Sequence, residues 1–177
     1  MARLLMEIYE EEVNFAPTDE RVDGFADFSY GKLGCILAAT IGISNIAPTA
    51  HWSAKGRDFY EDHLLFERIY NAFNGFVDPV AEKAVGMSKD GRIVDTCRLM
   101  KATYAFVEET NHLGQEELST KVLIAVQSYK KLVTKCYIDM KADGLLTPGI
   151  ENLLQGLLDE TEKQEYLLGR IQSGILG

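Results

Sequence analysis

Two histidines and two acidic residues lie in one part of the chain, where their side chains could bind a metal ion. His51 precedes His63 by twelve positions, and Asp78 and Glu82 follow four apart. On a helix, residues four apart share a face one turn apart, as His63 and Glu67 also would. Imidazole and carboxylate groups suit iron, manganese or zinc. On spacing alone, an ordinary ion pair or a hydrogen-bonded core group is the commoner role of such a pair.

The separation along the chain decides whether one molecule could complete a metal site. Fifteen positions separate His63 from Asp78, which is about 22 Å along an unbroken helix. Metal–ligand bonds measure only about 2 Å, so one continuous helix cannot bring both residues to one ion. Two copies packed antiparallel about a two-fold axis would form two equivalent sites. The Asn-Gly pair at 74–75 and Pro79 leave open a reversal that would allow a site within one chain.

Two long helices are predicted to carry these candidate ligands. The first runs from about residue 18 to the neighbourhood of His51, and a short glycine-containing turn follows it. Asp58 is then a good N-cap, and Glu61 three residues later completes the pattern of a capping box. Antiparallel helices joined by so short a turn would bring His51 and His63 close together.

Two further long helices are marked by their ends and by apolar periodicity. Residues 118–140 place apolar side chains on one face at steps of three and four. Gly144 stands where a left-handed C-cap belongs, and Thr147 and Pro148 begin the next helix. No period-two pattern predicts a strand. The predicted fold is therefore all-α, a ferritin-like four-helix bundle with a short extra helix in the crossing between helices two and three.

Length, charge and cysteine content limit the class of protein. The 177 residues predict one bundle domain over 18–172, between an N-terminal arm at 1–17 and a short tail at 173–177. The net charge of −9 would repel phosphate backbones and anionic membranes. The cysteines are Cys35, Cys97 and Cys136. Their number and spacing provide neither a disulfide framework nor a zinc motif, so we expect buried thiols in the reducing cytoplasm.

One uncharged stretch requires a decision between a membrane span and a core helix. Residues 33–50 carry no charged side chain and approach the length of a spanning helix. However, glycine, proline, serine, asparagine and threonine interrupt the stretch, and His51 follows it. These residues favour a core helix, buried on nearly all sides in a large or oligomeric protein, and no membrane association.

Residues 51–70 resemble the signature of the Dps family, the ferritin-like mini-cages named for DNA protection during starvation. The sequence HWSAKGRDFYEDHLLFERIY keeps that signature's histidines, tryptophan, glycine, phenylalanines and tyrosine in register. The sequence DPVAEK at 78–83 keeps its Asp, Ala and Glu. Residues 147–168 resemble the family's last helix, with Tyr166 in place of the usual Trp. The resemblance covers most of residues 30–170.

This resemblance implies a ferroxidase whose metal ligands come from two subunits of a homo-oligomer. His51 and His63 match the family's histidine ligands from one subunit, and Asp78 and Glu82 match its carboxylate ligands from the two-fold mate. Glu67 occupies a position where some members carry an additional acid. The family oxidises Fe(II), preferentially with hydrogen peroxide, and stores Fe(III) mineral in a hollow twelve-subunit shell, which limits oxidative damage. Zinc and manganese are further candidates for the same site.

Departures from the family pattern leave a second interpretation open. Ser53 replaces an asparagine, and Pro48 lies three residues before His51. Pro79 lies between the two carboxylate ligands, where it can kink the helix. Trp52, which matches an aromatic residue that lies against the family's site, is retained. The alternative is a non-catalytic cage or DNA-organising protein on the same fold, with a vestigial or zinc-occupied site.

Other charged residues carry weaker signals. Residues 1–31 hold two basic against eight acidic side chains, so DNA binding is not expected. Glu109 and His112 form an ExxH in a weakly helical region, which we interpret as chance. Three acids flank the turn between helices three and four, where the family's pores lie: Asp139, Asp143 and Glu151. These acids can be explained equally well as ordinary charges at helix ends and as residues that line an entry path for iron.

Overall fold

The computed structural model of the chain describes residues 28–88, 91–111 and 117–174. These contain the helices α2 (Phe28–Ser53), α3 (Phe59–Ser88), α4 (Thr96–Asn111), α5 (Leu118–Ala142) and α6 (Pro148–Gly174), and the 3₁₀ helix η1 (Gly91–Val94). No strand occurs in the described residues, so the prediction of an all-α chain is confirmed there. The expected arm at 1–17 and the expected helix start near residue 18 lie outside the described residues.

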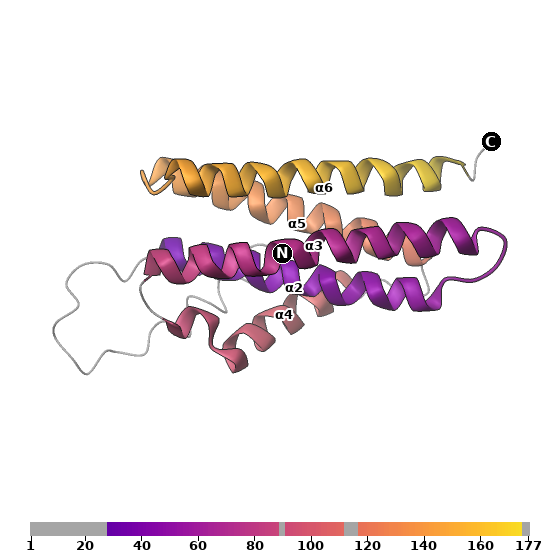
Figure 1. Cartoon of the computed structure of the whole chain (residues 1–177), viewed down its shortest axis with the longest axis horizontal. Helices are drawn as coiled ribbons and strands as arrows, with labels where there is room; N and C mark the ends of the chain where they lie inside the picture. Colours follow the sequence, from indigo (N-terminus) through magenta and orange to yellow (C-terminus); the bar gives the residue numbers. More distant parts are fainter. Residues whose placement is uncertain (1–27, 89–90, 112–116, 175–177) are drawn as a thin grey trace.

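The four long helices form a bundle, and the shorter α4 crosses one side of it (Figure 1). One antiparallel pair is α2 with α3, and the other is α5 with α6. The two pairs join because α2 also contacts α5 and α3 contacts α6. The helix α4 lies in the crossing between α3 and α5 and packs against α2 and α5. The predicted extra helix in that crossing is thus present.

The helix α2 is buried on nearly all sides within a single chain. Every residue over 32–40 is buried, because α3, α4 and α5 all contact this helix. Gly42 allows α4 to approach closely, since a Cβ at this position would lie 2.5 Å from Cδ1 of Phe106. By length and composition α2 could span a membrane, but 72% of its most apolar part is buried inside the bundle. Its burial is therefore explained by packing within the single chain, and it carries no information about the number of subunits.

One polar contact lies at the centre of the apolar core. Oγ1 of Thr40 lies 2.9 Å from the hydroxyl of Tyr129 and donates its one proton to the carbonyl of Ile36 at 2.7 Å. Tyr129 must therefore donate in the pair. Burial raises the pKa of Tyr129 well above its ordinary value, so the hydroxyl remains a donor. Phe73 packs edge-on against Tyr129 at 5.2 Å, so this contact joins α2, α3 and α5.

The turn between α5 and α6 forms as its residues predict. Gly144 has a φ of 70°. Its N–H donates to the carbonyl of Lys141 at 3.2 Å, and the next N–H donates to that of Met140 at 2.9 Å. These two bonds make a Schellman motif, which satisfies carbonyls at the end of α5. Thr147 then caps α6, because its Oγ1 accepts the N–H of Ile150 at 3.3 Å.

The helix α4 corrects two predictions. Cys35 and Cys136 are buried as expected, but Cys97 is exposed. It lies on the outward side of α4, at helical spacing from the exposed Met100 and Tyr104. The expectation of three buried thiols is therefore wrong for this residue. The region around the ExxH is also more helical than expected, since α4 continues to Asn111; His112 lies outside the described residues.

Candidate metal site

His51 and His63 face each other across the turn between α2 and α3. His51 belongs to the last turn of α2, and His63 is the fifth residue of α3. Their rings stack, with centroids 3.6 Å apart and planes inclined by 24°. The prediction that the short turn brings these two imidazoles together is confirmed.

Each imidazole ring is held by the backbone of the other histidine. Nδ1 of His51 lies 2.8 Å from the carbonyl oxygen of His63, and Nδ1 of His63 lies 3.2 Å from that of His51. A carbonyl oxygen only accepts, so both Nδ1 atoms must carry a proton. In the neutral rings, the lone pair on Nε2 is then available to a metal ion. The fold therefore orients two imidazoles as potential ligands.

Aromatic side chains of α3 lie against this pair. The ring of Tyr70 meets His51 edge-on at 5.6 Å, and the ring of Phe59 lies 5.1 Å from that of His63. Our sequence analysis assigned neither contact, although both residues stand at helical spacing from His63. Trp52, which the resemblance placed against the site, is 76% exposed in the single chain.

The helix α3 is continuous, which excludes a site formed by a reversal within it. It runs from Phe59 to Ser88 through Gly75 and Pro79. Both of these residues are exposed, so they leave the buried face of the helix intact. The apolar side chains of that face hold α3 against the bundle, and tertiary packing of this kind overrides local helix-breaking tendencies. The buried residues are Phe66, Ile69, Phe73, Val80 and Ala84.

The candidate carboxylates lie apart from the histidines in the single chain. Asp78 and Glu82 are exposed toward the other end of α3, and Asp78 is about 22 Å from His63 along a continuous helix. Glu67 is half-buried, one turn beyond His63. The described residues contain no group of three or more potential metal ligands. The chain thus brings together His51 and His63, with Glu67 on the same helix face.

The start of α3 gathers acidic groups that our sequence analysis did not connect. Asp62 directly precedes His63, and burial raises the pKa of its carboxyl, with smaller contributions from the charges of Asp58, Glu117 and Glu61. Glu117 directly precedes α5, so only the tertiary fold brings it near α3. Negative charge beside the two imidazoles would favour a cation at this end of the bundle.

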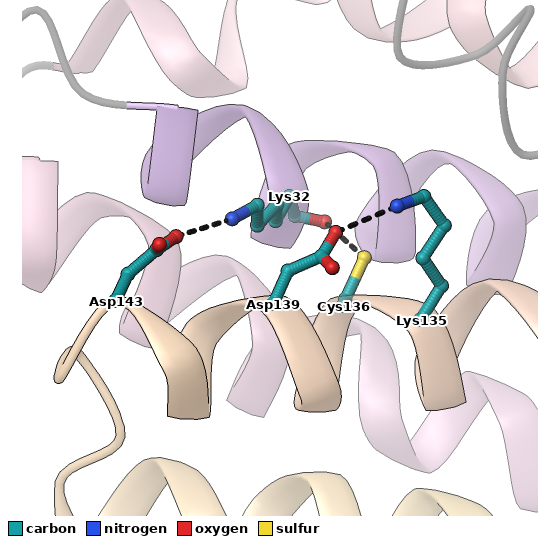
Figure 2. A network of polar contacts seen from close by, with 5 residues as sticks. All are labelled: Lys32, Lys135, Cys136, Asp139 and Asp143. Carbon is teal, nitrogen blue, oxygen red and sulfur yellow. Dashed lines mark hydrogen bonds and ion pairs between the residues drawn. The ribbon is translucent and has the colours of Figure 1, made fainter.

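The three acids considered for iron entry all have partners within the chain. Nζ of Lys32, a buried residue, donates to Oδ2 of Asp143 at 2.8 Å (Figure 2). Oδ2 of Asp139 accepts a bond of 2.8 Å from the lysine one turn earlier on α5. The hydroxyl of Tyr137 donates to Oε1 of Glu151 at 2.7 Å. These contacts are typical of helix-end charges, which favours that interpretation over an entry path for iron.

Comparisons with known proteins support the fold more strongly than the activity. None of the protein-family models matches the chain. General stress protein 20U of Bacillus subtilis is 28% identical over 72 residues, which are 41% of this chain and 48% of that protein, so the match spans about half of the relative. The structure of Dps from Thermosynechococcus elongatus is similar with a TM-score of 0.69 at 16% identity, over 94% of both chains. This likeness confirms the predicted ferritin-like fold.

Proposed function

We propose that this chain is a mini-ferritin that oxidises Fe(II) and stores the Fe(III) mineral, and so protects against oxidative damage. The observation that carries the proposal is the stacked pair of His51 and His63, whose Nδ1–H groups are bound to backbone and whose Nε2 atoms remain as ligands. The ferritin-like fold and the stress-protein relative are consistent with this role.

In this proposal the metal site is completed by a second copy of the chain. His51 and His63 come from one subunit, with Glu67 as a further ligand, and Asp78 and Glu82 come from the two-fold mate. The continuity of α3 supports this division, because it holds the two groups about 22 Å apart in one chain. The complete assembly would be a hollow shell of twelve subunits, as in the family that the sequence resembles.

Iron is the substrate of this site, and hydrogen peroxide is the preferred oxidant. Two Fe(II) ions each give up one electron, and one peroxide molecule accepts both as its O–O bond breaks. To leave as water, the two oxygen atoms take up two protons from solvent; otherwise they remain as hydroxide or oxide ligands of the Fe(III) product. Imidazole nitrogen suits Fe(II), whereas the carboxylates of Asp78 and Glu82 supply the oxygen ligands that a harder ion prefers. Because both electrons go to one peroxide, no hydroxyl radical is released.

Iron oxidation by histidine variants tests this function. Fe(II) is added anaerobically to the apoprotein, hydrogen peroxide follows, and the ferric absorbance is recorded. The His51→Ala/His63→Ala double variant is expected to lose the fast oxidation and the soluble mineral that elutes with the protein. His112→Ala, at the third histidine, is the matched control and should retain both. Equal rates for the wild type and the double variant would refute a ferroxidase role for this pair.

A zinc-occupied, non-catalytic site on the same fold, in a cage or DNA-organising protein, is the second candidate. The imidazole pair is the observation that supports it, because zinc binds imidazole readily and has no redox chemistry. Calorimetric titration with Zn²⁺ would distinguish the candidates. Binding that depends on both histidines, in a protein that does not accelerate iron oxidation, would favour this second function.

A further inference from the structure

The two imidazoles belong to a column of four aromatic rings at the turn between α2 and α3. In order, the rings of this column are those of Phe59, His63, His51 and Tyr70. The centroid of Phe59 lies 5.1 Å from that of His63, with the planes inclined by 31°. At the other end, Tyr70 meets His51 edge-on at 5.6 Å. Each imidazole thus has the other imidazole and one further aromatic ring as neighbours.

Helix geometry places three of these rings on one face of α3. Four positions separate Phe59 from His63, and seven separate His63 from Tyr70, which are the spacings of a shared helix face. Seven positions correspond to about 10 Å along a helix. This separation leaves room for one ring between His63 and Tyr70, and His51 of α2 occupies it. The column therefore depends on both helices and on the turn that joins them.

The hydrogen bonds alone do not fix the two imidazole rings equally. Nδ1 of His51 lies 2.8 Å from its carbonyl acceptor, whereas Nδ1 of His63 lies 3.2 Å from its own, at the long end of the range for such bonds. The χ2 torsion of histidine is broad, so one hydrogen bond leaves the ring some rotation. Contacts with neighbouring rings restrict this rotation and so determine the direction of Nε2. His63, with the longer bond, depends more on its aromatic neighbour.

The position of Phe59 in the fold gives it little part in the core of the bundle. It is the first residue of α3, and its side chain remains 45% exposed. The buried face of this helix begins seven residues later, at Phe66. Among the described residues, the ring contact of Phe59 is with His63. Burial of apolar area thus does little to explain an aromatic residue at this position, whereas a ring contact with the imidazole does.

We propose that Phe59 and Tyr70 are positioning residues for the two candidate histidine ligands. Phe59 fixes the ring of His63 and Tyr70 fixes the ring of His51, so each Nε2 keeps one direction before a metal ion arrives. The inference rests on the proposed metal-binding role of the histidine pair and adds the residues that orient it. Neither aromatic residue is a ligand. Each strengthens binding through the imidazole that it contacts, because a preorganised ligand loses less conformational entropy when it binds.

Zinc binding by aromatic variants tests this role. Zn²⁺ is titrated calorimetrically into the metal-free, full-length protein. Phe59→Leu is expected to weaken binding about tenfold, comparable to the lower end of the effect of losing a group that orients a metal-bound histidine. Phe59→Tyr keeps the ring and should bind Zn²⁺ as the wild type does. Tyr60→Leu, at the adjacent ring that is 66% exposed, is the matched control and should leave the affinity unchanged.

A second pair of variants separates the ring of Tyr70 from its hydroxyl. Tyr70→Phe keeps the edge-on contact with His51 and should bind Zn²⁺ normally, whereas Tyr70→Leu should bind it more weakly. The loss of affinity in Tyr70→Leu should be smaller than in Phe59→Leu, because His51 has the shorter hydrogen bond. Far-UV circular dichroism and the elution volume are measured for each variant, so that a loss of folding or assembly is recognised.

Chemical labelling of the metal-free protein gives an independent readout. Diethyl pyrocarbonate acylates an unprotonated imidazole nitrogen, and peptide mass spectrometry measures the labelling rate at each histidine. Phe59→Leu is expected to raise the rate at His63 relative to the wild type, with His112 as the internal reference. An unchanged rate at His63, an unchanged Zn²⁺ affinity in Phe59→Leu, or equal weakening in Tyr60→Leu would overturn the inference. A wild type that binds no Zn²⁺ would overturn it as well.

Iron oxidation by the same samples separates this inference from the proposed function. Weaker Zn²⁺ binding by Phe59→Leu, in a protein without histidine-dependent iron oxidation, would uphold the positioning role and reject the ferroxidase. Histidine-dependent iron oxidation, together with Zn²⁺ affinities that the aromatic variants leave unchanged, would reject the positioning role and leave the ferroxidase in place.

Discussion

The hydroxyls of Thr40 and Tyr129 meet at the centre of the bundle, and their roles in the contact are unequal. Thr40 gives its one proton to the backbone of α2, so Tyr129 is the donor between them. Removal of the acceptor would leave a buried O–H without a partner, which costs its full desolvation penalty. Removal of the donor would leave only an unused acceptor site on an oxygen that still makes one hydrogen bond.

Thr40→Val is therefore expected to destabilise the fold more than Tyr129→Phe. The free energy of unfolding, measured with urea, is expected to fall by about 2 kcal/mol in Thr40→Val and by about 1 kcal/mol in Tyr129→Phe. The protein concentration is held fixed, because assembly would couple to stability. The double variant should be more stable than Thr40→Val alone, since it no longer contains a buried Tyr129 hydroxyl without an acceptor. Equal losses in the single variants would show that the donor is assigned wrongly.

The candidate ligands could be predicted at the residue scale, but their orientation could not. His51 and His63 are uncommon residue types whose spacing around a short turn follows from helix geometry. Their hydrogen-bond partners are backbone carbonyls, which every residue possesses, so no residue type marks them in the sequence. The acidic group around Asp62 was missed for a related reason, because Glu117 reaches it only through the tertiary fold.

The helix α3 continues through Pro79 although proline cannot donate a hydrogen bond to the carbonyl of Gly75 four residues earlier. Pro79→Ala restores that donor, and we expect it to raise the free energy of unfolding by up to about 3 kcal/mol. Pro148→Ala is the control, because proline at the first position of α6 replaces an N–H that has no partner within the helix. Urea unfolding should show a gain in the free energy of unfolding for the first variant only. A lower free energy of unfolding for Pro79→Ala would mean that the proline ring stabilises the fold by more than the restored hydrogen bond does.

Glu165 on α6 joins the second helix pair, because it accepts hydrogen bonds from Gln127 and Lys130 of α5 at 3.1 and 3.0 Å. The bond from Lys130 lowers the pKa of the Glu165 carboxyl, and the same contact raises the pKa of Lys130. A lowered acid pKa stabilises the fold above the ordinary carboxyl value, and this stability is lost as pH falls through the folded value. For Lys130 the stability is complete below its ordinary pKa and is lost as pH rises through the folded value.

Glu165→Gln is therefore expected to be less stable than the wild type at neutral pH and to approach it in acid. The thermal midpoint is measured from pH 7 down through the ordinary carboxyl range, where protonation of Glu165 removes the advantage of the wild type. The difference in thermal midpoint between the wild type and Lys130→Met should likewise become smaller as pH falls. In the Lys130→Met background, Glu165→Gln should then change the thermal midpoint little further. If the difference in thermal midpoint between the wild type and Glu165→Gln stays constant with pH, the contact between Lys130 and Glu165 is not its source.

The ends of the helices could be predicted from the sequence better than the tertiary contacts that the helices make. Gly144 and Thr147 act through bonds to residues within five positions, so local sequence contains the whole signal. The burial of α2 depends on α4 crossing it, and Phe106 of α4 comes more than sixty residues after Gly42. Local propensity likewise predicted a possible break at Pro79, but the buried face of α3 lies on the opposite side and keeps the helix whole.

On the scale of the whole molecule, the charge is unevenly distributed over the bundle. The helix α5 contains five lysines and one aspartate, whereas the chain as a whole has a net charge of −9. Lys130 is nevertheless bound by Glu162 and Glu165 at 3.3 and 3.0 Å, and Lys135 is bound by Asp139. Carboxylates of the same chain thus already neutralise part of the most basic helix.

We therefore expect the protein not to retard plasmid DNA in a gel at about 150 mM salt, where charges are screened beyond about 8 Å. Affinity for DNA requires clustered lysine or arginine residues that replace the counterions of several phosphates. A variant with about six lysines added at its N-terminus is the positive control, and its retardation should weaken steeply as salt is raised. Retardation of the unmodified protein would mean that the lysines of α5 exchange their carboxylate partners for phosphates, and Lys131→Glu should then abolish it.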